Sequence, residues 1–117
     1  MKVLVVDDDA DIALMLARIF THLGHQSEAC SDAAEALEKA LISSFDIVLA
    51  DYIMSPNGVA VLSAFEPTNC FRVLITASYI TVEVQEALAA GIIHEVLMKP
   101  ATLADLRHVL CAAAVHL

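Results

Sequence analysis

Four acidic residues stand close together near the start of the chain, at Asp7, Asp8, Asp9 and Asp11. They follow the apolar run Val3–Val6, whose β-branched residues are typical of a short buried strand. Adjacent carboxylates repel one another, and a divalent cation such as Mg²⁺, which prefers oxygen ligands, would relieve that repulsion. Aspartate is also favoured in the first turn of a helix. The acids alone therefore leave two interpretations open, a metal site and an acidic helix start.

Three more polar residues stand at the ends of apolar segments. Asp51 follows the segment Ile47–Ala50, Thr76 closes a segment that starts at Arg72, and Lys99 follows the segment Glu95–Met98. Each of these residues alone is ordinary at the end of a strand. They indicate a functional site only if the fold brings the carboxylate, the hydroxyl and the ammonium group to one place.

The apolar segments alternate with stretches of helical periodicity. The helix after the first strand is expected from Asp11 to Leu23, with a buried face made of Ile12, Met15, Leu16, Ile19, Phe20 and Leu23. Capping residues and turn residues set the other boundaries. The remaining expected strands are Gln26–Cys30, Ile47–Ala50, Arg72–Thr76 and Glu95–Met98, and the remaining helices run from Asp32 to Leu41, Val59–Phe65, Val82–Ala90 and onward from Thr102.

This alternation predicts an α/β fold, a doubly wound parallel sheet of five strands with helices on both faces. The weakly apolar strand Gln26–Cys30 is expected at an edge of the sheet. In such sheets, ligands bind beyond the carboxyl ends of the strands. The polar residues that would meet at that edge are Asp7, Asp8, Asp51, Thr76 and Lys99.

Such a group of residues could carry out phosphoryl transfer. Asp51 could act as the nucleophile and form an acyl phosphate, while Asp7 and Asp8 hold a cation that neutralises the phosphoryl oxygens. Thr76 could donate a hydrogen bond to a phosphoryl oxygen, and Lys99 could pair with another.

The composition limits the other possibilities. The 117 residues are enough for one domain with a core, expected to span residues 1–117, and 59% of them are hydrophobic. The net charge is −9 with only six Lys and Arg residues, so direct binding to nucleic acid is not expected. There is no apolar run of membrane-spanning length and no paired-cysteine pattern, so we expect no membrane insertion and a reducing, cytoplasmic compartment.

The sequence resembles the receiver domain of two-component response regulators. The resemblance covers essentially the whole chain and is carried by four segments in the family's order: Val-Leu-Val-Val-Asp7-Asp8-Asp9, Asp-Ile-Val-Leu-Ala-Asp51-Tyr-Ile-Met54, Val-Leu-Ile-Thr76-Ala77 and Met-Lys99-Pro100. It implies a flavodoxin-like sheet with the strand order 2-1-3-4-5. It also implies cytoplasmic partners, a sensor histidine kinase or phosphotransfer protein and a downstream target protein.

The resemblance also assigns roles to single residues. It implies that Asp51 accepts a phosphoryl group from a kinase phosphohistidine, and that Mg²⁺ is held by Asp7, Asp8, Asp51 and the carbonyl of Ile53. Thr76 and Lys99 match the switch hydroxyl and the phosphate-contacting lysine. On this basis the chain is a signalling phosphoacceptor, which assists its own phosphorylation and dephosphorylation, and not a classical enzyme.

The chain departs from the family pattern in three places. The loop after Met54 is shorter, with its proline at Pro56, and one residue more than usual separates Gly91 from Lys99. Val96 stands where the family usually has an aromatic switch residue. These departures keep open an alternative, a receiver-like interaction or dimerisation module that does not depend on phosphorylation.

A Mg²⁺-dependent aspartyl-phosphate phosphatase is a more remote alternative. That class carries a second aspartate two residues after its nucleophile, and this chain has Ile53 there.

In receivers, the residue two after the phosphoacceptor and the residue two after the switch hydroxyl flank the path of the hydrolytic water. Here they are Ile53 and Ser78, and neither can hold a water well, which predicts a long-lived phosphorylated form.

The last third of the chain is rich in apolar residues and poor in charge. Their number exceeds the need of one helical face, so an exposed apolar patch is expected on the helix near 82–90, the strand near 95–98 and the last helix, usable for homodimerisation or target docking. The residues concerned are Val82, Val84, Leu88, Ile92, Ile93, Leu106, Val109 and Leu110.

Overall fold

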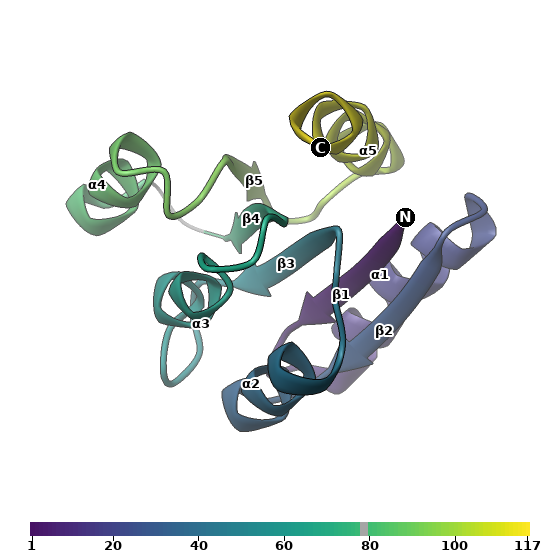
Figure 1. Ribbon diagram of the computed structural model, residues 1–117, viewed down its shortest axis with the longest axis horizontal. Helices are drawn as coiled ribbons and strands as arrows, with labels where there is room; N and C mark the ends of the chain where they lie inside the picture. The colour runs from purple at the N-terminus through teal and green to yellow at the C-terminus, as the bar shows by residue number, and fades with distance from the viewer. Residues whose placement is uncertain (78–79) are drawn as a thin grey trace.

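A computed structural model describes residues 1–77 and 80–117, and its fold is a parallel sheet between two layers of helices (Figure 1). The strands are β1 (Lys2–Val6), β2 (Gln26–Cys30), β3 (Ile47–Asp51), β4 (Phe71–Thr76) and β5 (Glu95–Met98). The helices are α1 (Ala10–His22), α2 (Ala33–Ile42), α3 (Gly58–Ala64), α4 (Val82–Ala89) and α5 (Leu103–His116). Each boundary that the sequence predicts lies within one residue of the observed one.

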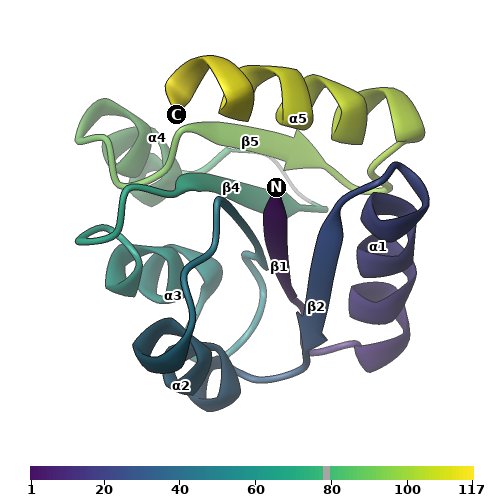
Figure 2. The ribbon, with the colours of Figure 1, turned by 45° about the vertical axis from the view of Figure 1, so that its right-hand side comes forward.

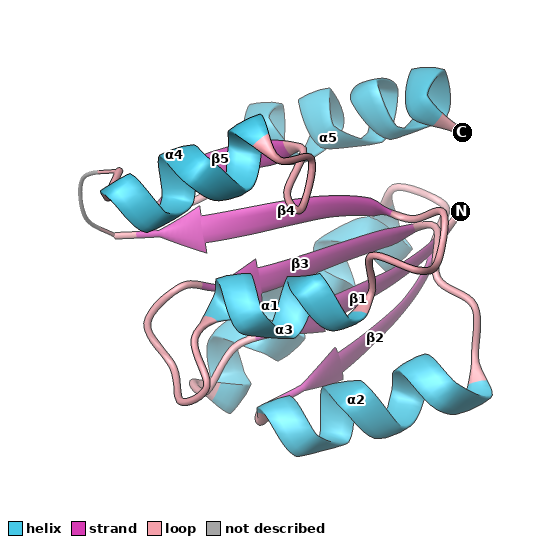
Figure 3. Ribbon diagram, turned by 60° about the vertical axis from the view of Figure 1, so that its left-hand side comes forward, coloured by secondary structure: helices cyan, strands magenta, loops and turns pink. Residues whose placement is uncertain are grey.

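The strand order is β2-β1-β3-β4-β5, and every neighbouring pair is parallel. This confirms the predicted fold class, and it confirms that β2 lies at an edge of the sheet. Helices α1 and α5 cover one face, and α2, α3 and α4 cover the other (Figures 1 and 2). All strands point the same way, so the loops that follow them gather at one edge of the sheet (Figure 3).

The sheet separates two hydrophobic cores, because successive strand residues point to opposite faces. In β1, Val3 and Val5 pack under α1 and α5, whereas Leu4 and Val6 pack under the other three helices. The central strands β1, β3 and β4 are buried on both faces, which explains why they are apolar almost throughout. This arrangement gives the strand ends a rigid base.

The face that α1 turns to the sheet agrees with the prediction at Leu16 and Phe20 and differs from it at Met15. The buried residues are Ala13, Leu16, Ala17 and Phe20, while Met15 is 52% exposed. Apolar residues on one face of a helix recur at i, i+3, i+4 and i+7, and the predicted residues and the observed buried residues both approximate this spacing. The two alanines let the helix lie close to the strands, which turns the larger side chain of Met15 outward.

Side chains cap the starts of the helices, and at α2 and α5 the caps are the predicted residues, Asp32 and Thr102. Asp9 Oδ1 accepts hydrogen bonds from the backbone N–H groups of Asp11 and Ile12 at the start of α1. Thr102 and Asp105 form a reciprocal capping box at the start of α5, with bonds of 2.8 and 3.1 Å. None of the helices in the described residues has the length and apolar character that a membrane crossing requires.

Gly58 lets helix α3 begin directly against strand β3. A Cβ atom at this position would overlap the carbonyl oxygen of Asp51 and would lie 2.7 Å from Leu74 Cδ1. The carbonyl belongs to the sheet backbone and cannot move aside cheaply. The start of α3 is therefore tied to the residue that ends β3.

We expect Gly58→Ala to lower the free energy of unfolding by about 1–3 kcal/mol, because the added methyl group overpacks this contact. Urea denaturation monitored by circular dichroism measures the change. Ser63→Ala on the exposed side of the same helix is the control, and it should leave stability nearly unchanged. A Gly58→Ala protein as stable as the wild type would show that α3 shifts to make room.

Candidate functional site

Three carboxylates meet at the edge of the sheet where the strands end. Asp7 and Asp8 follow β1, Asp51 ends β3, and one carboxylate oxygen of each lies within 4.8 Å of the others. They converge because β1 and β3 are adjacent and parallel, with Val6 paired to Ala50. Asp7 is 2% exposed and Asp51 4% exposed, whereas the side chain of Asp8 faces solvent. The cluster is therefore buried at its base and open on one side.

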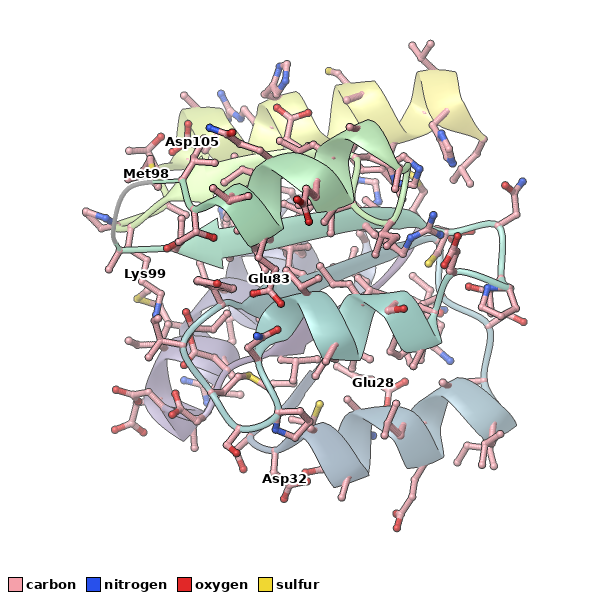
Figure 4. The ribbon with its side chains drawn as sticks, turned by 90° about the vertical axis from the view of Figure 1, so that its left-hand side faces the viewer. Glu28, Asp32, Glu83, Met98, Lys99 and Asp105 are labelled. Carbon is pink, nitrogen blue, oxygen red and sulfur yellow. The ribbon has the colours of Figure 1, made fainter. Side chains whose placement is uncertain are left out.

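Lys99 closes the buried side of this cluster. Its Nζ lies 3.1 Å from Asp7 Oδ2 and 3.2 Å from Asp51 Oδ1, so one ammonium group pairs with two carboxylates. The backbone places it there: the N–H of Lys99 donates to the carbonyl of Thr76 at 2.8 Å, which extends the β4–β5 pairing by one residue. In Figure 4 the Lys99 side chain lies at the edge where the strands end.

The charges of the cluster do not balance. Among the described residues, three carboxylates of this cluster face one ammonium group, so negative charge exceeds positive charge by two when all four groups are ionised. Burial raises the pKa of Asp51, the charges of Asp7 and Asp8 raise it further, and Lys99 only partly opposes them. Burial lowers the pKa of Lys99, but its hydrogen bonds and ion pairs with Asp7 and Asp51 outweigh burial and raise it overall. The site therefore favours the arrival of positive charge.

The structure divides the four N-terminal acids between the two interpretations that the sequence leaves open. Asp9 caps α1 and Asp11 lies in its first turn, so these two form the acidic helix start. Asp7 and Asp8 belong to the carboxylate cluster. Asp7 is held in place on both oxygens, since Oδ1 accepts the N–H of Asp9 at 2.9 Å and Oδ2 pairs with Lys99.

Thr76 and Ile53 lie at the same edge of the sheet. Thr76 is fully buried at the end of β4, beside the strand that Asp51 ends. Ile53 lies in the loop after Asp51 with its side chain 60% exposed, and the part of its carbonyl in metal binding stays a prediction. Ser78, predicted to flank the path of the hydrolytic water, lies outside the described residues.

These residues fit a hard divalent cation. The three clustered side chains offer only oxygen atoms, they carry more negative charge than Lys99 neutralises, and Asp8 is open to solvent. Mg²⁺ usually binds one or two protein carboxylates and keeps several waters or phosphate oxygens, which suits a cluster with one open side. Asp7 and Asp51 are the two buried carboxylates of the cluster and share Lys99, and Asp51 is the one that ends strand β3.

The exposed apolar residues on α4, β5 and α5 are only partly the predicted ones, because Met98, Leu103 and Val115 are also exposed on these elements. Four of the eight predicted residues belong to the two cores, because α4 and α5 each bury one face against the sheet and together need more apolar residues than a single helix does. These four are Val84, Ile93, Leu106 and Val109. Two of the eight residues are clearly exposed, Val82 at 68% and Leu88 at 37%.

Sequence reasoning missed the residues that join the loop after Asp51 to helix α4. Tyr52 and Asn57 both donate hydrogen bonds to Glu83, which lies 31 and 26 residues further along the chain. No spacing rule links residues so far apart in sequence. The available signal was a tyrosine directly after the candidate nucleophile, in a chain with only two tyrosines.

Comparison with known proteins places the chain among signalling proteins. The family model described as the response regulator receiver domain matches residues 3–111. The transcriptional regulatory protein ZraR of Escherichia coli is 32% identical over 97% of this chain, which spans 26% of that protein's length.

Solved structures show the same fold. The Vibrio cholerae chemotaxis protein CheY4 has a TM-score of 0.84 and 27% identity, with 96% of this chain and 97% of that chain covered. The Thermotoga maritima response regulator TrrA, solved in complex with Mg²⁺ and BeF, has a TM-score of 0.79 and 22% identity, with 96% and 97% covered.

We expect Asp8→Ala to weaken the stabilisation by Mg²⁺ strongly, because it removes the solvent-facing carboxylate of the cluster. In metal-free buffer near neutral pH the variant should be at least as stable as the wild type, since one charge that repels Asp51 is gone. The pKa of Asp51 is raised in the folded state, so its ionisation costs stability as the pH rises through that pKa. The benefit of the substitution should therefore shrink in acid, where Asp51 is protonated.

Melting temperatures with and without Mg²⁺, across a pH series, measure both effects. Asp11→Ala is the control, because Asp11 lies outside the cluster. An Asp8→Ala protein that responds to Mg²⁺ as the wild type does would show that Asp8 is not a ligand.

Proposed function

The chain belongs to the response regulator receiver family and is the receiver domain of a two-component response regulator, and on this premise we propose that Asp51 is its phosphoacceptor. The observation that carries the proposal is the position of the Asp51 carboxylate. It is nearly buried, its pKa is raised, Lys99 lies 3.2 Å away and two further carboxylates adjoin it.

In the proposed reaction a carboxylate oxygen of Asp51 attacks the phosphorus of a phosphohistidine on a sensor kinase or a phosphotransfer protein. An O–P bond forms, the N–P bond breaks, and the histidine nitrogen leaves with the electron pair and takes up a proton. Lys99 contacts Asp51 already and can pair with a phosphoryl oxygen as charge arrives. The hydroxyl of Thr76 would donate a hydrogen bond to another phosphoryl oxygen.

Asp7, Asp8 and Asp51, with the carbonyl of Ile53, would hold Mg²⁺. The bound cation supplies charge neutralisation for the phosphoryl oxygens. Two features support this assignment, the oxygen-only cluster with its excess negative charge and the Mg²⁺–BeF complex of the Thermotoga protein. With Mg²⁺ bound, the carboxylates would depend less on Lys99 for neutralisation. Lys99 could then leave Asp7 or Asp51 and pair with a phosphoryl oxygen.

The proposed partners are a sensor histidine kinase or phosphotransfer protein as donor and a downstream target protein, all cytoplasmic. Direct binding to nucleic acid is not part of the proposal, because the net charge is −9. A homodimer through α4, β5 and α5 is proposed only as a second mode of interaction, since Val82 and Leu88 are the clearly exposed members of the predicted patch.

The second candidate function is a receiver-like module that binds partners without phosphorylation. Val96, in place of an aromatic switch residue, is the observation that favours it. A phosphatase is disfavoured, because Ile53 stands where that class needs an acid. Phosphorylation at Asp51 distinguishes the receiver from the phosphorylation-independent module. A phosphorylated form that persists without rapid turnover distinguishes it from a phosphatase, whose aspartyl phosphate is a short-lived intermediate.

We expect the protein to gain one phosphoryl group when it is incubated with Mg²⁺ and acetyl phosphate, and we expect Asp51→Asn to abolish this gain. Intact-mass spectrometry measures it. Asp9→Asn is the matched control, since it removes the same charge nearby while asparagine still caps α1. A phosphorylated Asp51→Asn protein, or a wild type that stays unmodified, would contradict the proposal.

We expect Ile53→Asn to shorten the lifetime of the phosphorylated form, because an amide beside the phosphoryl group can orient the attacking water and an isoleucine cannot. The rate of loss of the phosphoprotein after removal of the donor measures the change. Ile53→Val keeps the position apolar and should decay as slowly as the wild type. Equal decay of Ile53→Asn and wild type would mean that this residue does not control the water.

A further inference from the structure

The loop that follows the proposed phosphoacceptor is joined to helix α4 by one carboxylate. Tyr52 Oη donates a hydrogen bond to Glu83 Oε1 at 2.7 Å, and Asn57 Nδ2 donates to the same oxygen at 3.2 Å. Tyr52 Oη also lies 3.2 Å from the hydroxyl of Thr81, the residue that caps α4. Figure 4 shows Glu83 between helices α4 and α3.

The two residues that contact Glu83 stand at the two ends of the loop. Tyr52 directly follows Asp51, and its N–H donates to the carbonyl of Ile75 at 2.8 Å. Asn57 caps helix α3, with its Oδ1 accepting the N–H of Ala60 at 3.1 Å. Glu83 therefore holds both ends of the segment 52–57, which includes Ile53, to the first turn of α4.

These contacts are too exposed to add much stability. The Tyr52–Glu83 and Asn57–Glu83 bonds lie at the surface, where water competes for both partners. A hydrogen bond to a carboxylate is nevertheless shorter and stronger than a neutral one, and the Tyr52–Glu83 bond is short at 2.7 Å. Its main effect is then on the position of the loop and less on the stability of the fold.

Val96 increases the importance of this connection. A valine at the usual aromatic switch position offers no polar group that could respond to a phosphoryl group. Tyr52 and Val96 pack against the same hydrophobic core, the one under α2, α3 and α4. Within residues 1–77 and 80–117, the side-chain hydrogen bonds that join loop 52–57 to the start of α4 all end on Glu83 or on the capping residue Thr81.

We propose that Glu83, acting through Tyr52 and Asn57, is a positioning residue for the phosphoacceptor loop and couples Asp51 to the first turn of α4. The inference rests on the proposed function. A change in loop geometry on phosphorylation alters the contacts to Glu83 and hence the start of α4. Thermodynamic linkage makes this coupling reciprocal. If Mg²⁺ and a phosphoryl analogue at Asp51 change the affinity for a partner that binds Glu83 or Thr81, that partner changes their affinity for the site by the same factor.

The test compares variants that remove either half of the connection. We expect Tyr52→Phe and Glu83→Ala to lower the rate of phosphorylation by acetyl phosphate roughly two- to ten-fold, the range of one or two net hydrogen bonds. Glu83→Gln keeps an acceptor for Tyr52 and should recover part of the rate. The double variant Tyr52→Phe/Glu83→Ala should be no slower than Glu83→Ala alone, because both substitutions break the same link.

Two further measurements separate positioning from a loss of folded protein. Melting temperatures of the variants should stay close to that of the wild type. The backbone amide signal of Val84, which donates to Thr81 Oγ1 at 3.3 Å, should shift on addition of Mg²⁺ and beryllium fluoride in the wild type and much less in Glu83→Ala. Glu86→Ala is the matched control, since Glu86 is an exposed acid of the same helix with no described contact to the loop.

The outcomes separate this inference from the function on which it rests. A wild type that gains no phosphoryl group overturns both. If the wild type is phosphorylated, then wild-type rates in Tyr52→Phe and Glu83→Ala overturn the inference alone. Additive losses in the double variant, an equal loss in Glu86→Ala, or a loss that parallels unfolding also overturn it.

Discussion

Electrostatic repulsion among carboxylates at one edge of the sheet is the constraint on which the rest of the site depends. Asp7, Asp8 and Asp51 bring three negative charges within 4.8 Å, and Lys99 supplies one positive charge between two of them. The deficit makes the site receptive to a cation. It also makes Lys99 a shared partner, able to pair with a newly bound anion once other positive charge is present. A neutral cluster would bind neither group well.

Such a repulsive arrangement needs a rigid base, and the two-sided core supplies it. The strands that carry the acids are buried on both faces, with Val3 and Val5 under α1 and α5 and Leu4 and Val6 under the other helices. Their ends cannot move apart to relieve the repulsion without exposing apolar surface. Gly58 extends this rigidity to α3, because its backbone touches the residue that carries the proposed nucleophile. The loop between them is held less firmly, by surface hydrogen bonds to Glu83.

Much of the fold and part of the site can be predicted from the amino-acid sequence. The elements follow from period and capping. Buried strands are apolar throughout, the apolar residues of a helix recur about every 3.6 residues, and residues such as Asp32 and Thr102 mark helix starts locally. The meeting of Asp7, Asp51 and Lys99 follows from topology, since parallel strands end at one edge. The roles of Thr76 and of the Ile53 carbonyl remain proposals based on family resemblance.

The order and type of the elements, and the edge at which the reactive residues gather, are already contained in the amino-acid sequence, because they depend on local period and on chain direction. The face of α1 that meets the sheet is not, since it was the packing in three dimensions that turned Ala13 and Ala17 inward and Met15 outward. The same packing divided the acids between cluster and helix cap, and joined Tyr52 to Glu83 across 31 residues. These outcomes depend on distances between segments remote in the chain, and such distances are set by how side chains pack around the whole sheet.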